Sequence, residues 1–194
     1  MFLQLTSLGK VSRMKHLLQS PFTLAKGMLA KIEREIEWAG KGKKAAILAK
    51  MNGLVEPEMI KALYKASQAG VQIDLVVRAM CSLRPGVKGL SDNIRVKSVI
   101  GRFLEHHRAF YFQNGGDAEL YLSSADWMER NLFRRVEIAF PILDKKIRER
   151  IIENLHGYLD DDAETWTLAA DGSYSRVNRG TKGIQQKLLD ELAA

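Results

Sequence analysis

Two adjacent histidines stand just before a segment whose residues alternate in the manner of a β-strand. The stretch reads RFLEHHRAFYF and places His106 and His107 directly before Arg108. An imidazole at the end of a strand can attack phosphorus or protonate a leaving oxygen, depending on its protonation state. A neighbouring arginine can hold phosphoryl oxygens through its fork of N–H donors. These residue types favour phosphate chemistry, and ordinary surface residues at a strand end are the alternative.

Basic residues gather in the sequence that leads to the histidines. The whole chain has a formal net charge of +7, which favours polyanionic partners such as nucleic acid, polyphosphate, nucleotides or an anionic membrane surface. Between residues 78 and 108 the basic residues are Arg78, Arg84, Lys88, Arg95, Lys97, Arg102 and Arg108, and only Asp92 and Glu105 oppose them. The run predicts an anion-binding site, with a solvated loop region as the alternative.

The composition predicts a globular domain. The chain has 194 residues, of which 46% are hydrophobic and 27% charged, and this length can bury a core. Cys81 is the one cysteine, so no internal disulfide can form, and a reducing compartment fits best. No stretch of 18 apolar residues and no signal-peptide pattern occurs in the sequence. We therefore expect a cytoplasmic protein, with peripheral attachment to a membrane as a variant.

Hydrophobic periodicity predicts strands that alternate with helices. The expected strands cover 45–51, 72–78, 93–100, 108–113, 118–124 and 134–143, with a β-hairpin at 165–177. Helices are expected at 23–39, 57–69, 144–159 and 181–194, and short helical turns at 101–106 and 125–131. Thr23, Pro57 and Asp144 stand at positions typical of helix starts, and Asn52-Gly53 is expected to form a turn. The order predicts an α/β fold with a mixed sheet flanked by helices, whose first crossover is parallel.

Familiar signatures of other chemistries are missing from the sequence. It contains neither GxxxxGK[ST] nor GxGxxG, and one cysteine with four mostly scattered histidines makes zinc a poor expectation. One template fits better. Phospholipase D-like phosphotransferases carry H-x-K-x4-D, followed by a strand that ends in G-S-x-N. Here His106 and Arg108 take the first two places and SSADW follows, although Gln113 stands at the acidic position. Ser124 and Asp126 are expected to orient the site.

Four segments together resemble the bacterial polyphosphate kinase family. They are KMNGLVEP, VVRAMCSLRPG, RFLEHHR and LSSADWMERN, and the similarity extends over about residues 2–174. It points to the second of two phospholipase D-like catalytic domains. Such enzymes transfer the terminal phosphate of ATP to a growing polyphosphate chain, and the reverse. The resemblance implies a catalytic histidine at His106, with Arg78 and Arg135 around the nucleotide phosphates.

Two neighbours of His106 leave a choice open. His107 stands where the family often has serine, and strand alternation would turn it to the other face, away from the phosphate. Arg108 is either a further phosphate ligand or a partner of Glu105. Asn52 is either a phosphate donor or a turn former. Cys81 has no evident base and receives no catalytic role.

The resemblance also implies a division of the chain. Residues 1–22 would be a lead-in, the tail of a preceding domain, residues 23–180 the phospholipase D-like catalytic domain, and residues 181–194 a C-terminal helix. A first catalytic domain with a phosphorylated histidine and the magnesium ligands would then lie outside this chain, so no metal site is expected within it. ATP or ADP, inorganic polyphosphate, and the first catalytic domain or another copy of the chain are the expected partners.

Two other functions remain open at this stage. A phospholipase D-like phosphodiesterase or nuclease could form a homodimer in which His106 of each subunit meets its counterpart. A non-catalytic module could bind polyanions through basic charge alone. The departures at Arg108 and Gln113 from the phosphodiesterase motif count against the first of these alternatives.

Overall fold

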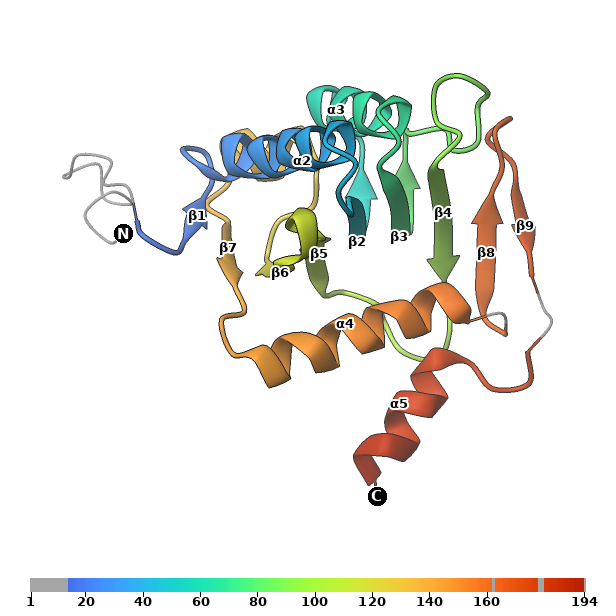
Figure 1. Ribbon diagram of the computed structural model, residues 1–194. Coiled ribbons are helices and arrows are strands. Elements are labelled where there is room, and N and C mark those ends of the chain that lie inside the picture. Colours follow the sequence, from blue (N-terminus) through green and yellow to red (C-terminus); the bar gives the residue numbers. More distant parts are fainter. Residues whose placement is uncertain (1–13, 162, 178–179, 194) are drawn as a thin grey trace.

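A nine-stranded mixed sheet organises the computed structural model, which describes residues 14–161, 163–177 and 180–193 (Figure 1). The strand order is β1-β7-β6-β5-β2-β3-β4-β8-β9. The strands are β1 (Leu18–Gln19), β2 (Ala46–Leu54), β3 (Gln72–Cys81), β4 (Ile94–Val99), β5 (Arg108–Phe112), β6 (Glu119–Ser123), β7 (Ile138–Pro141), β8 (Thr165–Leu168) and β9 (Tyr174–Arg176). The expected lead-in lies partly outside the described residues, and its end supplies β1, which pairs with β7.

Three parallel strands form the centre of the sheet. β2 pairs with β3 and β3 pairs with β4 in parallel, whereas β5 to β9 and β1 add antiparallel pairs. β2 is buried at every position from Ile47 to Leu54, as expected for a central strand covered on both faces. The α/β class and the mixed sheet flanked by helices are therefore confirmed.

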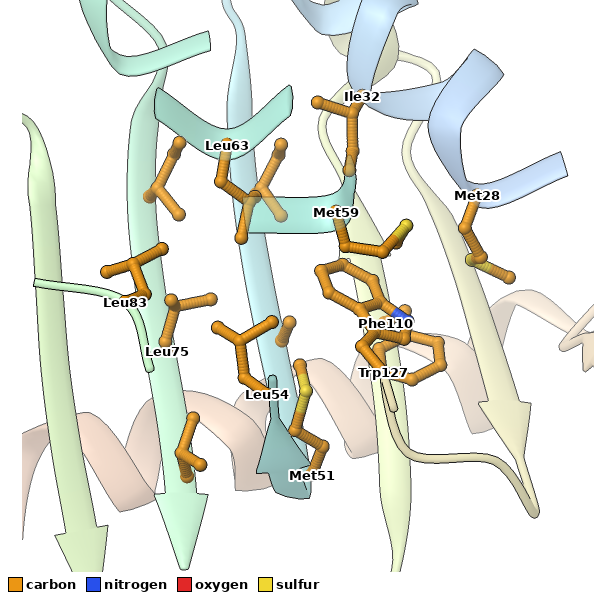
Figure 2. Packing of buried hydrophobic residues seen from close by; sticks show 14 of the residues in the cluster. Met28, Ile32, Met51, Leu54, Met59, Leu63, Leu75, Leu83, Phe110 and Trp127 are labelled. Atoms are coloured by element: carbon orange, nitrogen blue, oxygen red, sulfur yellow. The ribbon is translucent and has the colours of Figure 1, made fainter. Parts of the chain in front are cut away.

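Helices cover both faces of this sheet. They are α2 (Leu24–Gly40), α3 (Pro57–Gln68), α4 (Lys145–Asp160) and α5 (Ile184–Ala193). On one face Met28 and Ile32 of α2 and Met59 and Leu63 of α3 pack on the strands, where Phe110 stacks on Trp127 with ring centroids 4.9 Å apart (Figure 2). On the opposite face α4 packs through Leu155 on Leu48, Ala109, Tyr111 and Leu120.

The starts of two helices follow the sequence signals. Pro57 begins α3, and the Glu56 carboxylate accepts the Met59 N–H at 2.7 Å. Asp144 caps α4 by accepting the Ile147 N–H at 2.9 Å. Thr23 precedes α2 without a side-chain cap bond, because its hydroxyl oxygen accepts the N–H of Gln19 at 2.9 Å instead.

Several expected boundaries were wrong for reasons of tertiary structure. Residues 101–106 form an irregular loop and not a helical turn. Within it, the N–H and the carbonyl oxygen of Phe103 both form hydrogen bonds with the Gln185 side chain. A π-helix, η2 (Arg130–Arg134), shortens the strand expected at 134–143, and α5 starts three residues later than expected. Asn52 and Gly53 lie inside β2, at a register shift in its pairing with β3, and do not form a turn.

Candidate phosphate-binding site

An open pocket of about 480 Å³ lies where β2 and β3 approach their C-terminal ends. Because β5 runs antiparallel to β2, the N-terminal end of β5 reaches the same edge of the sheet. In α/β folds, ligands collect beyond the carboxyl ends of the parallel strands. The charged residues that line this pocket are Arg78, Arg108, Asp126, Arg130, Arg135 and Glu137, and His106 lines it as well. The three positions that the family resemblance singled out, Arg78, His106 and Arg135, therefore meet in one cavity.

The two histidines lie in the loop before β5 and have different surroundings. Strand alternation does not separate them, since β5 begins only at Arg108. His106 lines the pocket, and its ring has no hydrogen-bond partner among the described residues. His107 is outside that lining: its Nδ1 lies 3.8 Å from a carboxylate oxygen of Glu105, and its ring meets Tyr158 edge-on at 5.7 Å between centroids. Burial, the nearby Lys50 charge and Arg108 lower the pKa of His107 to about 4, against the opposing effect of Glu105.

Arg108 forms an ion pair with Asp126. Nη2 of Arg108 lies 2.8 Å from Oδ2 and Nε lies 3.2 Å from Oδ1, while Nη1 donates to the His106 carbonyl oxygen at 2.8 Å. The expectation that Arg108 might instead pair with Glu105 is wrong, since Lys50 occupies that place at 2.9 Å. Arg108 lines the pocket with three of its donors already used.

Asp126 gathers further donors beneath the pocket. It accepts the backbone N–H groups of Asn52 at 2.7 Å and Gly53 at 3.2 Å, and the Asn52 side-chain amide at 3.3 Å. Burial alone would raise the pKa of this carboxyl. The Arg108 bond and charge and the two backbone donors outweigh burial and hold the pKa below its ordinary value. Asp126 is therefore ionised and holds Arg108 and Asn52 by hydrogen bonds.

Asn52 links Asp126 to Arg78 through hydrogen bonds of its side chain. Its Nδ2 points at Asp126 and at the His106 carbonyl oxygen, so its Oδ1 is turned the other way and accepts from Arg78 Nε at 3.0 Å. Asn52 is buried, and both N–H donors of its side chain point at acceptors of the protein. The terminal guanidinium nitrogens of Arg78, in contrast, have no hydrogen-bond partner within the described residues. Arg78 can thus present two donor groups to an anion in the pocket.

A π-turn brings two more cations to the pocket. The Arg135 N–H donates to the Arg130 carbonyl oxygen at 2.9 Å, and both residues line the pocket. In this i→i+5 geometry the two residues stand on the same side, and π-turns are frequent at functional sites. Arg134 faces outwards and pairs with Glu129 at 2.7 Å. Of these two adjacent arginines, Arg135 is therefore the one that lines the pocket.

Three polar residues of the wall were not predicted from the sequence as site residues. They are Arg130, Asn131 and Glu137. The Glu137 carboxylate accepts from the Ser124 hydroxyl at 2.5 Å and from the Asn131 amide at 2.9 Å, which ties the first turn of η2 to the segment after β6. Arg130 lies in LSSADWMERN, one of the four segments that carry the family resemblance, and this segment is a signal that could have pointed to it. Asn131 and Glu137 carry no such signal, because the fold alone joins them.

The described residues do not fit a magnesium site. No group of three or more histidine, cysteine, aspartate or glutamate side chains that could hold a metal ion occurs in residues 14–161, 163–177 and 180–193. Asp126 and Glu137, the acidic residues of the pocket, are already committed to donors of the protein.

Cys81 does not line the pocket, and burial raises the pKa of its thiol to about 11. Among the described helices, none is long and apolar enough to cross a membrane.

Comparison with known proteins assigns the chain to a family. The family model "Polyphosphate kinase C-terminal domain 2" matches residues 17–187. Polyphosphate kinases of Pseudomonas aeruginosa and Paraburkholderia phytofirmans are 56% and 52% identical to the chain over its full length. The chain covers 29% and 28% of these two relatives, respectively. The crystal structure of polyphosphate kinase from Porphyromonas gingivalis superposes with a TM-score of 0.93 at 37% identity, covering 99% of this chain and 30% of that one.

A more distant likeness concerns the fold alone. Nuc, a phospholipase D family member from Salmonella typhimurium, matches with a TM-score of 0.57 at 14% identity, over 79% of this chain and 96% of its own. The phospholipase D-like fold expected from the His106 motif is therefore present. The chain spans a little under a third of the length of the curated relatives it matches. It belongs to the polyphosphate kinase family and corresponds to the C-terminal domain 2 of these enzymes.

Proposed function

We propose that this chain supplies half of a phosphotransfer site, in which a polyphosphate kinase reversibly transfers the terminal phosphate of ATP to polyphosphate. One observation carries the proposal: Arg78, His106 and Arg135 come from three separate segments and line one open pocket. Four guanidinium groups and two carboxylates line it in total, a formal excess of two positive charges. Such a surface suits a phosphate chain, whose charge grows with its length.

The free cations fit what phosphoryl transfer needs. In this reaction the bond from the γ-phosphorus to the β–γ bridging oxygen breaks, a bond to the acceptor forms, and ADP leaves with the bridging oxygen. Catalysis is mostly positioning and stabilisation of charge on the phosphoryl oxygens. Arg78 and Arg135 have donor groups available for those oxygens, whereas Arg108 is held by Asp126 and takes the smaller share of the phosphate contacts.

His106 is the proposed catalytic residue. Its ring lines the pocket without a hydrogen-bond partner from the described residues, so it can give a proton to a leaving phosphate oxygen or take one back in the reverse direction. The group that receives the phosphate lies outside this chain in our proposal, on a first catalytic domain that would also hold magnesium. The chain by itself would then bind nucleotide and polyphosphate but transfer phosphate weakly or not at all.

The remaining partners follow from the same proposal. ATP or ADP and inorganic polyphosphate are the substrates, and the protein partner is the first catalytic domain or another copy of this chain. We place the protein in the cytoplasm, where ATP is available and where a lone cysteine such as Cys81 stays reduced.

Titration calorimetry of this chain with ADP and with long-chain polyphosphate tests the proposal. Both ligands should bind, and His106→Ala or Arg78→Ala should weaken binding about tenfold, in line with the loss of a charged hydrogen bond. His107→Ala serves as the matched control, since His107 lies outside the pocket lining and should bind ADP like the wild type. A folded wild-type chain that binds neither ligand would overturn the proposal.

The two alternative functions give different results in the same experiments. A homodimer that hydrolyses a generic phosphodiester, and loses that activity on His106→Ala, would identify a phosphodiesterase. Binding that falls steeply with salt but ignores both His106→Ala and Arg78→Ala would identify a non-specific polyanion module.

A further inference from the structure

A buried ion pair lies behind the phosphate pocket and is absent from its lining. Lys50 of β2 is 2% exposed, and its Nζ lies 2.9 Å from a carboxylate oxygen of Glu105 and 4.8 Å from the centre of the Tyr158 ring. Burial lowers the pKa of Lys50 against the effect of its partner. For Glu105, burial acts to raise the pKa, but the bonds from Lys50, Gln185 and Tyr158 outweigh it and keep the pKa below the ordinary value.

Glu105 is the residue that fastens the histidine loop. Among residues 101–107, all of them described, Glu105 alone is buried. The apolar side chains of this loop add little packing, since Phe103 is 46% and Leu104 71% exposed. The loop that carries His106 is thus held by polar contacts and not by a hydrophobic core.

The C-terminal helix completes this attachment through a single side chain. Nε2 of Gln185, in α5, donates to Glu105 at 2.7 Å and to the carbonyl oxygen of Phe103 at 2.8 Å, while its Oε1 accepts the Phe103 N–H at 2.7 Å. α5 is itself fixed by Asp161, which accepts the Ile184 N–H at 2.8 Å. One glutamine therefore bridges α5 to Phe103 and to Glu105, which are the third and the first residue before His106.

A buried charge pair is a costly way to stabilise a fold, because desolvation offsets most of its attraction. Packing alone does not require Lys50 and Glu105 at these positions, where apolar side chains would fill the same space. Their contacts instead converge on the loop whose end enters the pocket. We infer that Lys50, Glu105 and Gln185 are positioning residues for His106, so that the docking of α5 sets the geometry of the phosphate site.

That Gln185 and Glu105 anchor the loop follows from the contacts above, whereas the effect of this anchoring on ligand binding rests on the proposed function. Gln185→Met tests both, because methionine keeps the length and packing of the side chain but removes its hydrogen bonds. Gln186→Met is the matched control: Gln186 lies next along the same helix, is exposed, and its side chain bonds Asp190 of α5 and no other side chain among the described residues.

Two measurements on the folded variants separate the possible outcomes. Amide hydrogen exchange at Phe103 and through residues 101–108 should speed up at least about tenfold in Gln185→Met and stay unchanged in Gln186→Met. Affinity for ADP should fall about five- to tenfold in Gln185→Met alone, at a temperature where all variants are folded.

The inference fails if exchange in the loop is the same in the two variants, and this result does not depend on whether ADP binds. It also fails if the loop loosens but ADP binds to Gln185→Met as to the wild type, since the loop would then not position the site. A wild-type chain that does not bind ADP counts against the proposed function instead, and loop exchange still decides the anchoring.

Discussion

Arg108 and Asp126 face each other through two hydrogen bonds, with Nη2 to Oδ2 at 2.8 Å and Nε to Oδ1 at 3.2 Å. The pair joins the start of β5 to the segment after β6, and both side chains are nearly buried. Asp126 also holds Asn52, which in turn orients Arg78. The ion pair therefore forms the floor of the pocket and fixes a second arginine that it does not contact.

Asp126→Asn should be one of the most damaging single changes in the chain. It leaves Arg108 without its carboxylate in a nearly buried place, for which we expect a loss of about 3–5 kcal/mol in the free energy of unfolding. Chemical denaturation measures this loss. Glu129→Gln is the control, since its exposed pair with Arg134 should contribute less than about 1 kcal/mol. Equal effects of the two changes would contradict the role given to Asp126.

Arg130→Ala should weaken binding of tripolyphosphate without unfolding the protein. Arg130 lines the pocket and has no ion-pair partner within the described residues, so its guanidinium is available to an anion. We expect a loss of about tenfold in affinity and a salt dependence that is shallower by about one unit of the log–log slope. The neighbouring Arg134→Ala removes the same charge from the outer surface and should leave affinity nearly unchanged. Similar losses in both variants would indicate charge alone.

His107 should make the fold less stable as the pH falls from about 6.5 towards 4. Its pKa in the folded protein is about 4, mainly through burial, so in this range the unfolded chain takes up a proton that the folded chain does not. Because the side chain is half exposed, the contribution is on the order of 1 kcal/mol. His107→Asn should flatten the pH dependence of the unfolding free energy in this window. An NMR titration midpoint near 6.5 for the His107 ring would contradict the prediction.

Lys50→Met should destabilise the protein more than a double variant that also neutralises its partner. The single change leaves the Glu105 carboxylate buried without its cation, at a cost of about 3–5 kcal/mol. Lys50→Met with Glu105→Gln removes both charges and keeps an oxygen that accepts from Gln185, so about 2 kcal/mol should return. Denaturation curves of the three proteins provide the test. If the double variant is no more stable than Lys50→Met, the unpaired charge of Glu105 is not the cause of the destabilisation.

Much of the architecture could be read from local sequence signals. Apolar runs predicted the central strands 45–51 and 72–78, and Pro57 and Asp144 marked the starts of α3 and α4, because such signals act within a few residues. The same signals failed where distant groups intervene. In the irregular 101–106 loop, both backbone groups of Phe103 bond Gln185, 82 residues later in the chain.

The sequence by itself determined the family, through its four motif segments, and the candidate residues Arg78, His106 and Arg135. Only the tertiary structure decided how those residues are held. In the folded protein Arg108 pairs with Asp126, and Lys50 pairs with Glu105. Arg135 lines the pocket whereas Arg134 pairs with Glu129 on the surface, and Gln185 bonds Glu105 in the histidine loop. The physical reason is that an ion pair or hydrogen bond depends on distance in space. Residues 18 to 82 positions apart in the chain meet only after the strands and helices between them have packed.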